Sequence, residues 1–219
     1  MLKILFVFGF FSICQTQFAH AQSLSLEQIT MAGSGCPAGS VGVSLSPDGR
    51  ALSLLYSQFT VEGTGNSERN CQVSVRMRAP KHYKVHMAKA DLRGFTSLPA
   101  QARGTFETLI RFTDWRNSSK TESLRQNFQG PVNDSFFLSA ATPESRWGNC
   151  GGMEFTIVLE TRFSMQNQTT EAALLSLDSS DITAGPAANI YHLELDACGP
   201  GGNGNGNGRG NGNGNGRGS

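Results

Sequence analysis

The chain lacks the features that would assign it to a membrane or to nucleic acid. After residue 21 no stretch approaches the ~18 apolar residues that a membrane-spanning helix needs, and the polar C-terminus carries no glycolipid-anchor signal. Charge of one sign is also missing, because 18 lysines and arginines nearly balance 17 aspartates and glutamates. Such a balance provides neither a basic patch for nucleic acid nor a broad field for charged substrates. We therefore expect no membrane span and no nucleic-acid partner.

Motifs for catalysis and for metal binding are equally sparse. There is no Gly-x-Ser-x-Gly sequence to present a serine nucleophile and no Cys-x-x-Cys pair for zinc. After residue 21 the histidines are His82, His86 and His192, and Lys84 between the first two would repel a cation. We expect solvated histidines, no metal and no cofactor.

Carboxylates that share one face of a predicted strand are the remaining catalytic candidates. Glu154 and Glu160 form one such set, and Glu194 and Asp196 form another. Glycosidases place two carboxyl groups about 5–10 Å apart, but many β-sheet surfaces meet that spacing by chance. We interpret all four as solvated charges. The sequence leans against an enzyme, with a hydrolase using an unrecognised carboxylate or serine as the alternative.

The N-terminus predicts a cleaved signal peptide over residues 1–21. Lys3 precedes an apolar run that is too short to span a bilayer, and the run is followed by Ala19-His20-Ala21, a small-x-small cleavage site. We expect cleavage after Ala21 and a secreted protein, either extracellular or periplasmic.

Four cysteines remain after the signal is removed, an even number that favours disulfides in an exported chain. They are Cys36, Cys71, Cys150 and Cys198. We predict the pairs Cys36–Cys71 and Cys150–Cys198, because each joins cysteines within one half of the domain. A Cys36–Cys198 pair is the second choice.

Alternation of apolar and polar residues with a period of two predicts an all-β domain over residues 22–198. The sequence Ser46-Pro47-Asp48-Gly49 is a turn signal and predicts a hairpin between strands at 41–45 and 51–59. Few segments show the sequence pattern of a helix. Residues 24–31 fit a short helical turn, and residues 171–177 fit a helix or a strand. About eight or nine antiparallel strands predict a disulfide-stabilised β-sandwich, with jelly-roll-like and immunoglobulin-like topologies both open. Further strands are expected at 71–79, 83–92, 106–112, 134–139, 153–163 and 191–197.

A low-complexity tail follows Cys198. The eight-residue unit GNGNGNGR occurs twice between Gly202 and Arg217, without an apolar side chain to bury. Nothing in such a segment offsets the entropy of ordering it, so we predict a disordered tail at 199–219.

The order of these motifs resembles a secreted family of fungi and bacteria known as domain of unknown function 4360. The likeness spans residues 31–198. The resemblance implies export and a β-rich fold, and it implies no reaction. The matching motifs are Gly-Ser-Gly-Cys-Pro at 33–37, Ser-Leu-Ser-Pro-Asp-Gly at 44–49, Asn-Cys at 70–71, Arg-Gly-Phe at 93–95, Trp-Gly-Asn-Cys-Gly at 147–151, Asp-Ser-Ser-Asp at 178–181 and Tyr-His-Leu at 191–193.

The candidate ligand-binding residues are Trp115, Arg116 and Phe95. Trp115 and Arg116 lie in a polar stretch between predicted strands, and both residue types commonly anchor binding interfaces. We expect a non-enzymatic extracellular module that binds a surface, a glycan or a cell-surface protein. The alternatives to this binding module are the hydrolase and a structural envelope or matrix protein.

Overall fold

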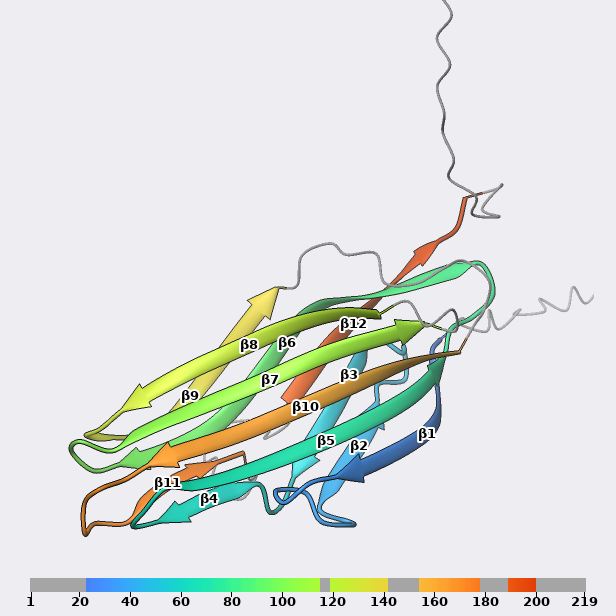
Figure 1. Ribbon diagram of the computed structural model, residues 1–219. Helices are drawn as coiled ribbons and strands as arrows, with labels where there is room; N and C mark the ends of the chain where they lie inside the picture. The colour runs from blue at the N-terminus through green and yellow to red at the C-terminus, as the bar shows by residue number, and fades with distance from the viewer. Residues whose placement is uncertain (1–22, 115–118, 142–153, 178–188, 200–219) are drawn as a thin grey trace, which may run out of the picture.

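The computed structural model describes residues 23–114, 119–141, 154–177 and 189–199, which form two stacked antiparallel β-sheets (Figure 1). The sandwich that the alternation predicted is therefore confirmed. Among the described residues there is no helix that could cross a membrane. The strands are β1 Ser25–Ala32, β2 Val41–Leu45, β3 Ala51–Tyr56, β4 Thr60–Gly63, β5 Ser67–Arg78, β6 Tyr83–Leu98, β7 Arg103–Asp114, β8 Ser119–Gln129, β9 Val132–Ala141, β10 Glu154–Gln166, β11 Ala173–Ser176 and β12 Asn189–Ala197.

The two sheets interleave strands that are distant in the sequence. The five-stranded sheet has the order β1-β5-β10-β7-β8. The seven-stranded sheet has the order β2-β3-β12-β6-β11-β4, with β9 also paired to β6. The start of β1 and the end of β12 lie at one end of the sandwich (Figure 1), because Ser25 pairs with Arg78, Ala197 pairs with Tyr83, and only four residues separate Arg78 from Tyr83.

The prediction of a short helical turn at residues 24–31 is wrong, because this segment forms the edge strand β1. Its backbone pairs with β5 along Ser25–Ala32, and this long-range pairing outweighs a weak local preference for helix. Of the helix and the strand that residues 171–177 both fitted, the structure shows a strand, β11. The expected count of eight or nine strands was too low, since the described residues form twelve.

A chain of aromatic rings joins the two sheets in the core. Phe163 of β10 contacts Phe59 at 5.3 Å and Phe106 of β7 at 5.2 Å between ring centroids. Phe106 in turn contacts Phe136 of β9, in the opposite sheet, at 5.6 Å. Phe59, Phe106 and Phe163 are fully buried, so this cluster is a main source of hydrophobic stabilisation between the sheets.

The Cys36–Cys71 disulfide is confirmed, and it closes a separation of 35 residues. Cys36 follows β1 at the point where the chain leaves the five-stranded sheet, and Cys71 lies within β5. The second predicted pair is not described: Cys198 is disulfide-bonded, but Cys150 lies outside the described residues, as does the tail from residue 200 onward.

Glycines let the chain pass closely beside this disulfide. A Cβ atom on Gly33 would lie 2.3 Å from the Asn70 carbonyl oxygen, and one on Gly35 would lie 2.2 Å from the Phe59 ring. The Gly35 N–H also donates to the Asn70 carbonyl at 2.8 Å. The glycine-rich motif at 33–37 therefore has a packing role.

The turn predicted at Ser46-Pro47-Asp48-Gly49 joins β2 and β3 as expected. Gly49 has a φ of 72°, a conformation that glycine adopts without steric cost. The Asp48 carboxylate accepts a hydrogen bond from the Arg50 N–H at 3.1 Å. The hydrogen bonds from the Ser46 hydroxyl and from Arg50 lower the pKa of Asp48.

Two buried tyrosines predict a loss of stability at alkaline pH. Burial raises the pKa of Tyr56 to about 12, and burial together with the neighbouring Tyr56 raises the pKa of Tyr191 well above its ordinary value. Between pH 10 and 12 the unfolded chain releases the Tyr56 proton while the folded chain retains it. The free energy of unfolding should therefore fall by about 3 kcal/mol from Tyr56 alone as the pH rises from below 10 to above 12, and by more with Tyr191.

Denaturant titrations at stepped pH, with tyrosinate followed by ultraviolet absorbance, test this. Tyr56→Phe is the matched control: the Tyr56 hydroxyl has no hydrogen-bond partner among the described residues, so its removal should cost little at neutral pH. The variant should show a shallower alkaline decline than the wild type, and an equal slope would contradict the prediction.

Candidate functional site

The outer face of the five-stranded sheet is hollowed at three places, each of which reaches β10. Three depressions of about 500, 440 and 250 Å³ cross this sheet diagonally, and each includes part of β10. The first lies over β7, β8 and Ser164 and Gln166 of β10, the second over β5, β7 and Glu160 and Arg162 of β10, and the third over β1, β5 and Thr156 of β10. From Thr156 to Gln166 the strand covers about 33 Å at the usual rise per residue. This face, called the β10 face below, is long, shallow and open to solvent.

Strand alternation explains why polar side chains line the β10 face. The inward residues of β10, such as Phe155, Ile157 and Leu159, are buried in the core. The outward residues between them project to solvent, and pairing with β5 and β7 places outward residues of three strands side by side. The central depression is thus lined by Gln72 of β5, Glu107 and Leu109 of β7, and Glu160 and Arg162 of β10.

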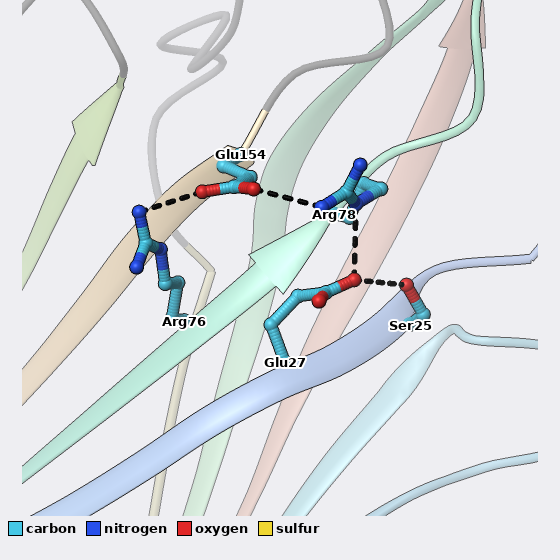
Figure 2. Close-up of polar contacts among 5 residues, drawn as sticks. All are labelled: Ser25, Glu27, Arg76, Arg78 and Glu154. Atoms are coloured by element: carbon cyan, nitrogen blue, oxygen red, sulfur yellow. Dashed lines mark hydrogen bonds and ion pairs between the residues drawn. The ribbon is translucent and has the colours of Figure 1, made fainter.

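Ion pairs cross the end of the β10 face from β1 to β10 (Figure 2). Glu27 of β1 accepts from Ser25 at 3.3 Å and from Arg78 of β5 at 3.0 Å. Arg78 also pairs with Glu154 of β10 at 2.8 Å, and Arg76 pairs with the other oxygen of Glu154 at 2.6 Å. These groups are at least one-third exposed, so their contribution to stability is small. Their effect is to fix the geometry of the surface side chains.

The central depression combines paired and unpaired polar groups. Glu160 pairs with Arg111 at 3.3 Å, and Arg162 pairs with Glu68 at 3.4 Å. Glu107 and Gln72 have no ion-pair or hydrogen-bond partner of their side chains among the described residues, and Glu107 is half-buried. Unpaired acceptors and donors in a depression are available to a polar ligand.

Amides and hydroxyls line the end of the β10 face nearest Arg103. The Thr105 hydroxyl donates to Asn127 Oδ1 at 3.1 Å, and Gln129 and Gln166 lie beside them. No aromatic side chain points outward among the lining residues of the three depressions, since Phe128 packs against the core. Ligand contacts here would be hydrogen bonds and ion pairs.

Two of the carboxylates predicted as solvated lie on the β10 face, and each is held by arginine. Glu154 and Glu160 are six residues apart on one strand, or about 20 Å, which is beyond the separation of a glycosidase pair. They cannot act together on one bond.

The expectation of solvated histidines is wrong for His86, whereas His192 is 40% exposed and also has a carboxylate partner. His86 of β6 is only 14% exposed and lies 3.2 Å from Glu194 and 3.5 Å from Asp196 of β12. His192 of β12 contacts Asp91 of β6 at 2.8 Å. Adjacent strands bring these groups together, so Glu194 and Asp196 are also partnered. Among the described residues no cluster of three or more metal-ligating side chains could hold a metal ion.

Of the predicted ligand-binding residues, the structure places only Phe95. It is half-buried on the outer face of β6, on the opposite side of the sandwich from the β10 face. Trp115 and Arg116 lie outside the described residues. Apart from Glu154 and Glu160, the side chains of the β10 face were not predicted as candidates, because their only signal in the sequence is the polar half of an ordinary alternating pattern.

Comparison with known proteins gives one family and several distant folds. The family described as "Domain of unknown function (DUF4360)" matches residues 22–198. An "Uncharacterized secreted protein" of Arthroderma benhamiae is 26% identical over 130 residues, which are 56% of this chain and 52% of the relative. The chain thus spans about half the length of this curated relative.

Among solved structures, the carbohydrate-binding module TmCBM61 in complex with β-1,4-galactotriose is 8% identical, with a TM-score of 0.28 over 77% of this chain and 88% of that chain. The CBM22-1 xylan-binding domain of Paenibacillus barcinonensis Xyn10C is 12% identical, with a TM-score of 0.25 over 80% and 86%. At this distance the likeness carries no argument about a ligand, and the proposals below rest on the residues of this chain.

Proposed function

The chain belongs to the family described as Domain of unknown function (DUF4360), and we propose that it is a non-enzymatic module that binds an extended polysaccharide along the β10 face. The secreted relative and the Cys36–Cys71 disulfide point to an extracellular location. The observation that carries the proposal is the succession of three depressions across one sheet face, each of which includes residues of β10.

The shape of the β10 face favours a linear polymer over a small ligand. A small-molecule site is a cavity that encloses most of its ligand. These depressions are instead shallow and succeed one another across the sheet, meeting β10 at positions that span about 33 Å. A polymer chain laid diagonally across the sheet, from β8 over β10 to β1, would contact all three in turn. Affinity would then come from several weak subsites.

The chemistry of the face suits sugar hydroxyl groups. Hydroxyls both donate and accept, and the face presents amides, guanidinium groups and carboxylates that do one or both. The ion pairs at Arg78 and Arg162 hold long side chains in fixed positions before a ligand arrives, which reduces the entropy lost on binding. The absence of outward aromatics at the three depressions predicts binding dominated by hydrogen bonds.

The test is a glycan array and a pull-down with insoluble polysaccharides, followed by calorimetry on the best ligand. A Gln72→Ala, Arg162→Ala double variant should bind at least about tenfold more weakly, since each lost hydrogen bond to a charged or amide group is worth about 1 kcal/mol or more. Asn133→Ala, an exposed amide of β9 on the opposite side of the sandwich, is the matched control and should bind like the wild type. Equal affinity of all three proteins would contradict the proposal.

One observation favours a hydrolase as the second candidate. Glu160 pairs with Leu109, so Glu107 is its diagonal neighbour on β7, and both line the central depression. Diagonal neighbours lie about 7–8 Å apart, within the range of an inverting glycosidase. Reducing-end release from the bound polysaccharide, lost in Glu107→Gln, would support catalysis and overturn the non-enzymatic proposal. Binding without turnover would support the module.

A further inference from the structure

A second polar and aromatic cluster lies on the outer face of the seven-stranded sheet. Arg93 of β6 is directly opposite Phe137 of β9 in the register, and its guanidinium carbon lies 4.8 Å from the centre of the Phe137 ring. Phe137 is 55% exposed, which makes it the most exposed large apolar side chain among the described residues. Phe95 lies two residues beyond Arg93 on the same face of β6.

Arg93 carries a charge without a carboxylate partner among the described residues. The nearest acidic group along its strand face is Asp91, and that carboxylate is already occupied. Lys89 lies 2.9 Å and the Ser139 hydroxyl 2.7 Å from one oxygen, and His192 lies 2.8 Å from the other. Partial burial alone would raise the pKa of Asp91, but these three hydrogen bonds outweigh burial and lower it.

The Arg93 guanidinium is held in place by the ring beneath it rather than by an ion pair. Its backbone is fixed as well, because the Arg93 N–H donates to Oδ1 of the buried Asn189 at 2.8 Å. A planar guanidinium that is stacked on an aromatic ring keeps its N–H groups free in the plane, and these match the two oxygens of a carboxylate. The exposed surface of Phe137 beside it is apolar.

We propose that Arg93 and Phe137, with Phe95 beside them, form a separate subsite for an acidic sugar, in which Arg93 binds the carboxylate and Phe137 contacts the sugar ring. Because the Arg93 guanidinium has no carboxylate partner among the described residues, its charge favours an anionic ligand. Because the exposed Phe137 ring lies beside it, the ligand should also have an apolar face that can pack on this ring. A uronic acid residue of a glycan meets both conditions. This subsite is on the opposite side of the sandwich from the β10 face and does not depend on it.

The experiment is calorimetry on the full exported chain with two probes that differ only in the carboxylate, an oligogalacturonate and the neutral galactose oligomer of equal length. The wild type should bind the acidic probe at least about tenfold more tightly, because a hydrogen bond to a charged group is worth about 1.5–3 kcal/mol. Arg93→Gln should remove this preference, and Arg93→Lys should restore part of it. Phe137→Ala should weaken binding of both probes, and Ser44→Ala on β2, outside the cluster, should change neither.

Equal affinity of the wild type for the two probes would overturn the proposal, as would an acidic preference that survives Arg93→Gln. Tighter binding of a sulfated galactose oligomer than of the oligogalacturonate would also overturn it, because the ligand would then be a sulfate ester. The Gln72→Ala, Arg162→Ala variant separates this proposal from the preceding one. It should keep the acidic preference even where binding along the β10 face is lost.

Discussion

Replacing both Cys36 and Cys71 by alanine is expected to lower the free energy of unfolding by about 4 kcal/mol. The bond closes 35 residues of chain, and a loop of that length loses about 4 kcal/mol of closure entropy in the unfolded state. The enclosed segment contains β2, β3 and β4, which belong to the seven-stranded sheet, while Cys71 lies in the five-stranded sheet. In the unfolded chain the bond therefore limits how far the segment that forms β2, β3 and β4 can separate from the segment around Cys71.

Substitution is a cleaner test than reduction, because Cys198 is disulfide-bonded too and a reducing agent would act on both bonds. Denaturant melts of the double variant and the wild type give the difference directly. Ser44→Ala, within the same loop but exposed, should stay within about 0.5 kcal/mol of the wild type. A loss below about 1 kcal/mol in the double variant would mean that the unfolded chain is already compact around this loop.

Phe163→Ala is expected to be as damaging, at about 3–5 kcal/mol. The ring is fully buried and lies at the centre of the aromatic chain, with Phe59, Phe106 and Phe136 around it. These neighbours come from both sheets, so they cannot collapse into the space without moving one sheet against the other. The cavity should remain open, and an open cavity gives the large end of the range.

Two controls separate the cavity from a general effect of losing an aromatic residue. Phe163→Leu keeps most of the volume and should lose clearly less stability than Phe163→Ala. Phe137→Ala removes a ring that is more than half exposed and should stay within about 0.5 kcal/mol, which also shows that the variant used to test the acidic-sugar subsite is folded. A Phe163→Ala protein with a thermal melt close to that of the wild type would contradict the packing account.

The parts of the fold that could be predicted are those with a local signal. Alternation is complete along β10 and along β5 from Cys71 onward, because these segments have one face on the core and one in solvent. Gly49 marks the hairpin turn by its need for a positive φ. The missed strands lie at sheet edges. In β8 the inward positions hold Glu122 and Gln126 as well as Leu124 and Phe128. Polar and apolar residues therefore do not alternate along this strand. In β1 the pairing with β5 decides the structure.

The candidate sites were harder to predict for a different reason. The central depression of the β10 face joins Gln72, Glu107 and Glu160, and only strand order brings these three together. The same is true of Arg93 and Phe137, which are adjacent because β9 pairs with β6. Phe95 was predicted from the sequence, but its partners depend on register, and a single sequence does not reveal which strands are neighbours.

The position of the start of β1 and the end of β12 has a practical consequence for attaching the protein to a support. The start of β1 and the end of β12 lie at one narrow end of the sandwich, away from the middle of either broad face (Figure 1). A tag or a surface linkage placed before Ser25 or after Ala197 therefore leaves both faces exposed to solution. A single copy immobilised in this way leaves both proposed sites accessible, so the two binding proposals predict that it bridges two polymer strands, one on each side.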